Sequence, residues 1–296
     1  MYGTVDGFSY GAATPVAAYL MACLGAALGL RCTARSVRTR PSWKPGWLAL
    51  GSASIGSGIW TMHFIAMMGF HVKETPISFD IPITLLSLAV AIVVVGIGVF
   101  MVGYRGTSRA VLLPAGVFTG LGVAGMHYIG MSAMRMQGHL EYSVPTVLLS
   151  VLIAVVAGTA ALWAAVTIHG FRASLGSSMV MGVAATGMHY TGMAAVRVRL
   201  DDVLSASVGG KAPVSLILPL LIGPVVFLVI AGTIIMFDPL LVLGEGEWNE
   251  KKADSRRRPP PPPPRPVWPS RPPDDPVRAR EGRPAPPHGG QEYRPW

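Results

Sequence analysis

Apolar residues along the chain gather into seven long runs that short polar segments separate. The runs cover residues 11–30, 47–70, 81–102, 111–134, 144–168, 175–196 and 214–237. Each reaches the about 17–25 residues that a helix needs to cross the hydrocarbon core of a bilayer. The pattern therefore predicts an all-α protein with seven transmembrane helices.

The composition agrees with a membrane location. Of the 296 residues, 51% are hydrophobic and only 13% are charged, and the mean hydropathy is +0.48. Soluble domains carry about 25% charged residues. The formal net charge of +9 comes largely from one connecting segment and the last fifty residues. With no aromatic-basic binding surface beside it, this charge indicates contact with an anionic leaflet and excludes a nucleic-acid partner. We therefore expect a multi-pass protein of the plasma membrane.

The segment between the first two apolar runs sets the expected orientation. It holds five cations within fourteen residues, Arg31, Arg35, Arg38, Arg40 and Lys44. Loops rich in Lys and Arg stay in the cytoplasm. We therefore expect this segment to be a cytoplasmic loop, the N-terminus to lie outside and, after seven spans, the C-terminus to lie inside.

The chain divides into a membrane domain, residues 1–240, and a tail, residues 241–296. The tail carries a basic cluster at 251–258 and six consecutive prolines at 259–264. Such a sequence cannot bury a core and favours extended polyproline-II conformations. We expect a disordered cytoplasmic tail, no catalytic domain and no enzymatic activity, so that any output passes to a cytoplasmic signalling partner.

One six-residue motif occurs three times, at 62–67, 126–131 and 188–193, as Met, His, an aromatic residue, any residue, a small residue and Met. The histidines, His63, His127 and His189, are 64 and 62 residues apart. A glycine lies seven residues before each one, at Gly56, Gly120 and Gly182. Matching flanks at this spacing indicate an internal repeat of about two helices.

The three motif helices would run in the same direction and so bring their histidines to one depth in the outer half of the bilayer. A His and the Met four residues later share a helix face, so three such pairs could face one centre: His63 with Met67, His127 with Met131, and His189 with Met193. The preceding methionines, Met62, Met126 and Met188, would face a neighbouring helix or a second ion. Neutral imidazole and thioether ligands suit copper, Cu(I) above all. Zinc is disfavoured because the motifs contain no Cys, Asp or Glu.

Three other interpretations stay open. Methionines at helical spacing often only fill a core, and a membrane-embedded His can simply bond across helices. A copper-handling or transport protein would use the same ligands, although the absence of acidic residues inside the runs counts against proton coupling. A haem protein would use two of the histidines as axial ligands.

The three motif copies on alternate helices of a seven-helix chain resemble the MHYT-domain family of bacterial membrane sensors. The resemblance covers residues 1–240, with Phe64 and Ala66 as mild departures in the first copy. It implies copper bound by the His and Met residues near the outer face, and sensing of a diatomic gas such as O₂, CO or NO. Many relatives fuse this module to cyclic-dinucleotide enzymes or kinases. Because the tail of this chain has no such domain, a partner in trans is expected.

Overall fold

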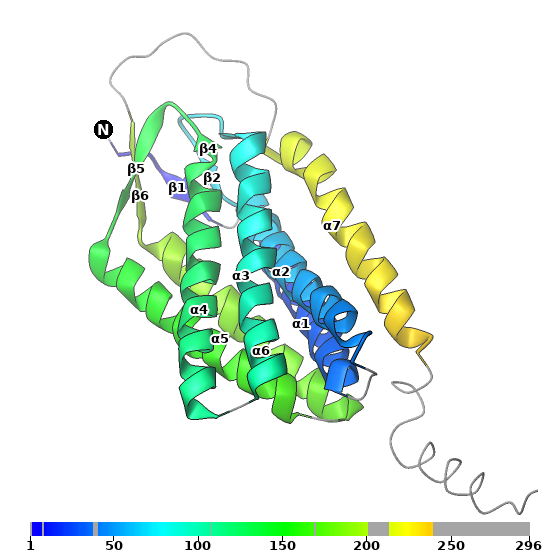
Figure 1. Ribbon diagram of the computed structural model, residues 1–296. Coiled ribbons are helices and arrows are strands. Elements are labelled where there is room, and N and C mark those ends of the chain that lie inside the picture. The colour runs from blue at the N-terminus through cyan, green and yellow to red at the C-terminus, as the bar shows by residue number, and fades with distance from the viewer. Residues whose placement is uncertain are drawn as a thin grey trace, which may run out of the picture. The chain divides into compact units, whose positions relative to one another are not determined.

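The computed structural model describes residues 2–7, 9–37, 41–106, 108–168, 170–200 and 213–238. Seven α-helices make up most of this part of the chain (Figure 1). They are α1 (Ala13–Val37), α2 (Lys44–Met68), α3 (Ile81–Arg105), α4 (Arg109–Ser132), α5 (Val144–Thr167), α6 (Phe171–Ala194) and α7 (Pro213–Met236). Each predicted apolar run forms one helix, so the all-α class is confirmed. The predicted tail, 241–296, lies outside the described residues.

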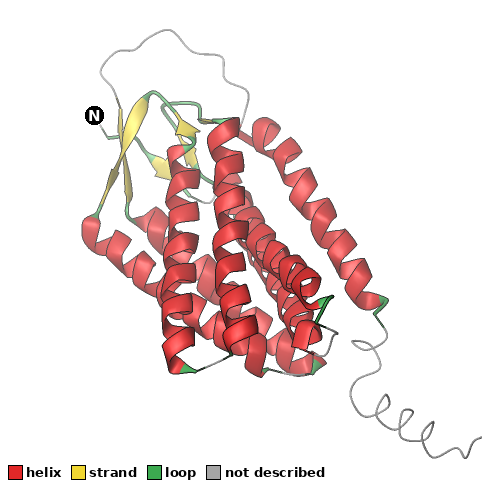
Figure 2. Cartoon of the chain, viewed as in Figure 1, coloured by secondary structure: helices red, strands yellow, loops and turns green. Residues whose placement is uncertain are grey.

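The described residues also form six short strands, which gather at one end of the bundle (Figure 2); this end is called the strand end below. They are β1 (Val5–Asp6), β2 (His71–Val72), β3 (Ser78–Phe79), β4 (Met134–Arg135), β5 (Gly138–Tyr142) and β6 (Val196–Leu200). They pair antiparallel as β1 with β2, β3 with β4 and β5 with β6. Each pair joins the strand before an odd-numbered helix to the strand after the next helix. The internal repeat is therefore a strand–helix–helix–strand unit, and α7 stands outside it.

The three units form a closed ring of helices. Each of α1 to α6 packs against the next, and α6 packs against α1. The repeat glycines make the contacts from each even-numbered helix to the following odd-numbered one: Gly56 lies against Ile92 of α3, Gly120 against Val155 of α5, and Gly182 against Cys23 of α1. A Cβ atom on Gly56 would come within 2.8 Å of the Cα of Ile92. Glycine at this repeat position thus permits close helix packing, as in other membrane bundles.

Helix α7 lies outside the ring and packs chiefly against α2 and α1 (yellow in Figure 1). Its end is fixed by an ion pair, in which Arg35 Nε donates to Asp238 Oδ2 over 2.9 Å. The guanidinium of Arg35 also stacks over the ring of Trp47 at 5.3 Å. The end of α7 is therefore tied to both helices of the first unit.

The expected cytoplasmic loop between the first two helices is shorter than its cations suggested. Arg31 and Arg35 belong to the last turns of α1, and Lys44 begins α2. Arg38 and Arg40 lie outside the described residues. The apolar run ends at Leu30, but the helix continues because long Arg side chains can extend their charged ends away from an apolar surface. The expected orientation stays a prediction.

Five of the helices are long and apolar enough to cross a membrane: α1, α3, α4, α5 and residues 217–236 of α7. Helices α2 and α6 are not among these five, so the count of seven spans stays a prediction. The sequence of α2 explains its lower hydropathy. It contains buried Ser52, Ser54, Ser57 and Thr61, which face other helices. In α2, Ser52 and Ser54 bond to carbonyl oxygens one turn earlier.

Candidate metal centre

The motif histidines of α2, α4 and α6 meet inside the ring. Their Nδ1 atoms form a triangle with sides of 3.0 Å (His63 to His189), 3.1 Å (His127 to His63) and 3.3 Å (His189 to His127). Each residue is 1% exposed. The rings meet edge to face, with planes inclined by 78–85°. Among the described residues, these three are the only group of three or more His, Cys, Asp or Glu side chains close enough to hold one ion.

The triangle has nearly the size that a metal ion requires. With sides of 3.0–3.3 Å, its centre lies about 1.8 Å from each nitrogen, whereas metal–imidazole bonds are about 2.0–2.1 Å long. An ion slightly above the plane of the three nitrogens would meet all three bond lengths. The sequence-based expectation that the three histidines face one centre agrees with this geometry.

Without a cation, the triangle has an unsolvable hydrogen-bonding conflict. A neutral imidazole Nδ1 either carries a proton and donates or carries a lone pair and accepts. Three atoms with two possible roles cannot form three donor–acceptor pairs, so at least two neighbours always repel. A cation removes the conflict because all three nitrogens then act as lone-pair donors to it. The chemistry of the site therefore fits a bound cation.

Two of the histidines are cradled by the small residue of the next motif copy. A Cβ atom on Gly130 of α4 would lie 2.6 Å from Nε2 of His63. A Cβ atom on Gly192 of α6 would lie 2.5 Å from Nε2 of His127. Both Nε2 atoms are buried and find no hydrogen-bond partner among the described residues. The motif therefore needs a small residue at this position because the neighbouring imidazole occupies the space of a side chain.

The third histidine borders open space instead. His189 lines a cavity of about 240 Å³ at the strand end, together with Ala66, Met67 and Met193. Val5 of β1 and Gly7, which follows this strand, line the same cavity. Two of the three predicted thioether ligands thus share a cavity with one imidazole. Sequence reasoning missed the contribution of β1 to this cavity, because β1 lies 57 residues or more before the first motif histidine.

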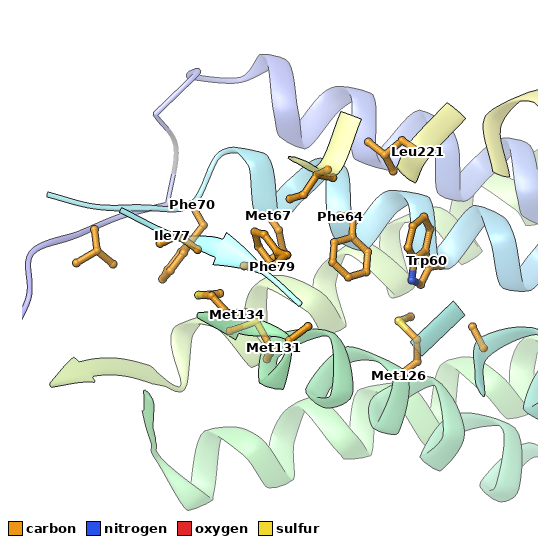
Figure 3. Close-up of a cluster of buried hydrophobic side chains, with 14 of the residues drawn as sticks. Trp60, Phe64, Met67, Phe70, Ile77, Phe79, Met126, Met131, Met134 and Leu221 are labelled. Carbon is orange, nitrogen blue, oxygen red and sulfur yellow. The ribbon is translucent and has the colours of Figure 1, made fainter. Parts of the chain in front are cut away.

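The motif methionines lie in hydrophobic clusters or pack against them. Figure 3 shows Met67 and Met131 with Met126 in the largest cluster, beside Phe64 and Trp60 of α2. Met193 packs against this cluster. Met62 belongs to a cluster of α1 and α2, and Met188 to one that joins α2 to α5. All of them therefore have packing partners, and their role as ligands stays a prediction.

The aromatic residue of each motif copy packs edge-on against the histidine before it. The ring centroids are 4.7 Å apart for His63 and Phe64, 4.9 Å for His127 and Tyr128, and 5.0 Å for His189 and Tyr190. Tyr128 also shares a 2.7 Å hydrogen bond with Ser150 of α5. These aromatic residues therefore pack against the imidazoles, and Tyr128 also links α4 to α5.

Comparison with known proteins agrees with the repeat seen in the structure. A family model described as MHYT, "Bacterial signalling protein N terminal repeat", matches residues 56–115 and 120–177. Its two matches begin at the glycines that precede His63 and His127 by seven residues. The third motif copy, on α6, follows these two segments. No solved structure matches the chain.

Several curated proteins are similar to part of the chain. The bifunctional diguanylate cyclase/cyclic di-GMP phosphodiesterase MucR of Pseudomonas aeruginosa is 39% identical over 166 residues, which are 54% of this chain and 24% of MucR. The cyclic di-GMP phosphodiesterase NbdA of the same species is 36% identical over 203 residues, 65% of this chain and 26% of NbdA. The signalling protein YkoW of Bacillus subtilis is 32% identical over 191 residues, 62% of this chain and 23% of YkoW.

The chain thus spans about a quarter of the length of these curated relatives. The resemblance read from the motif is confirmed, since the family model begins each repeat at the same glycine and covers the first two histidines. Residues 56–115 and 120–177 therefore match the MHYT family of bacterial signalling-protein repeats.

Proposed function

We propose that this protein is an integral membrane sensor that binds copper at the histidine triangle and responds to a diatomic gas such as O₂, CO or NO. The observation that carries the proposal is the triangle of three Nδ1 atoms, 3.0–3.3 Å apart and buried inside the ring. Its size and its hydrogen-bonding conflict both favour a cation at this place. His63, His127 and His189 would hold the ion.

Copper in its monovalent state suits the surroundings best. The three imidazoles supply neutral nitrogen atoms, and no carboxylate among the described residues joins their group. The cost of burying a charge in a medium of low dielectric constant rises with the square of that charge, so a divalent ion would cost about four times as much. Imidazole with thioether is also a donor set that Cu(I) favours. Met67 and Met193, in the cavity at His189, are the methionines that would complete it.

The cavity at the strand end supports the sensing part of the proposal. It borders His189 on one side and the N-terminal segment on the other. A ligand the size of a diatomic gas would fit a volume of about 240 Å³ without displacing a side chain. Bound copper would supply an open coordination position for such a ligand, and the protein supplies a mainly apolar wall.

Signalling relatives support the output part of the proposal. MucR and NbdA carry names of cyclic di-GMP enzymes, and this chain matches only about a quarter of each. The described part of this chain would accordingly be the sensor and not an enzyme, with a cytoplasmic partner receiving the signal in trans. We further infer seven crossings of the plasma membrane with the N-terminus outside. The polar residues of α2 do not oppose this count, since they face other helices.

The geometry favours this function over two rivals. Two axial ligands of a haem iron lie about 4 Å apart, on opposite sides of a flat macrocycle, whereas all three Nδ1 atoms here are within 3.3 Å. A transporter for ions needs a polar path. The cavity that continues beyond the triangle is lined by alanine, valine, isoleucine, leucine, methionine and glycine with one threonine.

The decisive experiment measures the metal content of purified protein by elemental mass spectrometry after loading with Cu(I) or Zn²⁺. The wild type should retain copper in stoichiometric amount and prefer it to zinc. Replacing His63, His127 and His189 together by Ala should abolish retention, while the control His139→Ala should not, because His139 lies on β5 with its side chain 56% exposed. Copper retained by a folded triple variant would refute the proposal.

A further inference from the structure

A second cavity lies on the other side of the histidine triangle, away from the strand end. It has a volume of about 70 Å³, and all six helices of the ring contribute to its lining. The motif helices line it in two layers related by the repeat. Four residues before the histidines, the layer consists of Ile59, Val123 and Ala185. Eight residues before them, it consists of Ile55, Thr119 and Met181.

The two layers place this cavity on the axis of the ring, directly beneath the triangle. Four and eight residues of helix correspond to about 6 Å and about 12 Å. Met188, the residue before His189, also lines it. The imidazoles therefore separate two hollow spaces, the cavity at the strand end and this second one. We call the second one the inner chamber.

The lining of the inner chamber is too apolar to hold water. Helix α5 covers it with small residues, among them Ala154, Ala157 and Ala161, and helix α3 with Val95 and Val99. A buried water requires two to four polar partners. The lining offers only the hydroxyl of Thr119, which finds no hydrogen-bond partner among the described residues. Several times the about 10–15 Å³ needed by one water-sized probe is available, so the space suits an apolar guest.

We propose that the inner chamber is a binding site for a small apolar molecule of the size of a diatomic gas. Apolar cavities of comparable lining stay free of water and bind guests such as xenon. The chamber would hold the gas within one helical turn of the imidazoles. This meaning for sensing rests on the proposed function, whereas the binding of an apolar guest does not require copper.

Xenon tests the site on metal-free protein. The methionine methyl groups are labelled with ¹³C in protein held in detergent micelles, and their signals are assigned by single Met→Leu replacements. The methyls of Met181 and Met188 should shift saturably as the xenon pressure rises. Met236, 74% exposed on α7, reports the unspecific effect of xenon dissolved in the micelle. No saturable shift at Met181 and Met188 would overturn the proposal.

Two matched variants locate the guest. Ala157→Leu adds three carbon atoms to the wall of the chamber and should abolish the saturable shift. Ala160→Leu adds the same group to the exposed face of the same helix and should leave the shift unchanged. A shift that survives in folded Ala157→Leu protein contradicts the proposal. Should Ala157→Leu not fold, Ile55→Ala enlarges the chamber and must strengthen the response at the same two methyls, and an unchanged response is again contrary.

Copper content, measured on the same samples after loading, keeps the two proposals apart. Xenon binding without copper retention would refute only the metal site. Copper retention without xenon binding would refute only the inner chamber.

Discussion

Two of the three motif histidines lie against a glycine, and the third, equally buried, borders a cavity. His63 and His127 each place Nε2 against a glycine of the next motif helix. His189 has no glycine at the corresponding place, since the first motif copy carries Ala66, and it borders a cavity of about 240 Å³. A threefold repeat has thus produced three ligands that are alike at Nδ1 and unlike at Nε2.

The difference shows how a repeat protein can make the two sides of one centre unlike, one closely packed and the other beside a cavity. Enclosure fixes the rings of His63 and His127, because their Nε2 atoms lie against backbone that cannot yield. The cavity beside His189 leaves room on that side of the triangle. We expect metal retention to depend on the enclosed pair and ligand access to depend on the third histidine.

The largest effect is expected from Gly192→Ala and Gly130→Ala. A Cβ atom at these positions would lie 2.5 Å and 2.6 Å from an imidazole nitrogen, so the ring must move out of the triangle. Overpacking of this kind costs about 1–3 kcal/mol of the free energy of unfolding, and we expect at least a tenfold loss of copper affinity. Competition with a chromogenic Cu(I) chelator measures the affinity.

Gly187→Ala is the control for these two substitutions. It lies on the same helix as Gly192, and a Cβ atom there would meet nothing within 4 Å. Equal copper affinity in Gly192→Ala and Gly187→Ala protein would show that the cradle does not position the imidazole.

A smaller effect is expected at the methionines, and it distinguishes the two sides of the triangle. Met193 lines the cavity at His189, whereas Met131 lies fully buried in the largest hydrophobic cluster. Replacement by Leu keeps volume and apolarity and costs less than about 1.5 kcal/mol in either case. Met193→Leu should weaken Cu(I) binding in the chelator assay more than Met131→Leu does. The reverse order would place the sulfur ligand on the enclosed side.

The smallest effect is expected from Ala66→Gly, which gives the first motif copy the glycine of the other two. Here His189 and Ala66 border the same cavity, so the substitution should leave copper affinity unchanged. Its only cost should be that of a glycine inside a helix, about 0.5–1 kcal/mol, seen as a small fall in the denaturation midpoint. A clear change in copper affinity would mean that Ala66 shapes the place of a histidine as Gly130 and Gly192 do.

The sequence predicted the seven helices and the meeting of the three histidines for clear physical reasons. The apolar runs had the length of a membrane-spanning helix, and a period of two helices brings equivalent residues to one depth. The strands were missed because β1 to β4 have two residues each, too few for an alternating pattern. The end of α1 was placed too early because Arg31 and Arg35 interrupt the apolar run without ending the helix.

Details of the site depend on which helices become neighbours. The sequence of a single motif copy does not predict these neighbours. Gly130 packs against the imidazole of His63, which is 67 residues away in the chain. The cavity at His189 needs Val5 and Gly7 of the N-terminal segment. The inner chamber, in contrast, follows the repeat closely, since its two layers lie four and eight residues before the histidines.

Helix α7 breaks the threefold symmetry of the ring. If the three repeat units were equivalent, a change at the histidine triangle would move all three in the same way. Leu221 of α7 packs in the cluster of Trp60 and Phe64, beside His63, and the far end of α7 is clamped where Arg35 holds Asp238. Helix α7 therefore packs chiefly on the first unit. In the sequence, α7 is followed by the basic, proline-rich segment. The contact of α7 with the first unit therefore gives a symmetric change at the histidines one asymmetric connection to that segment.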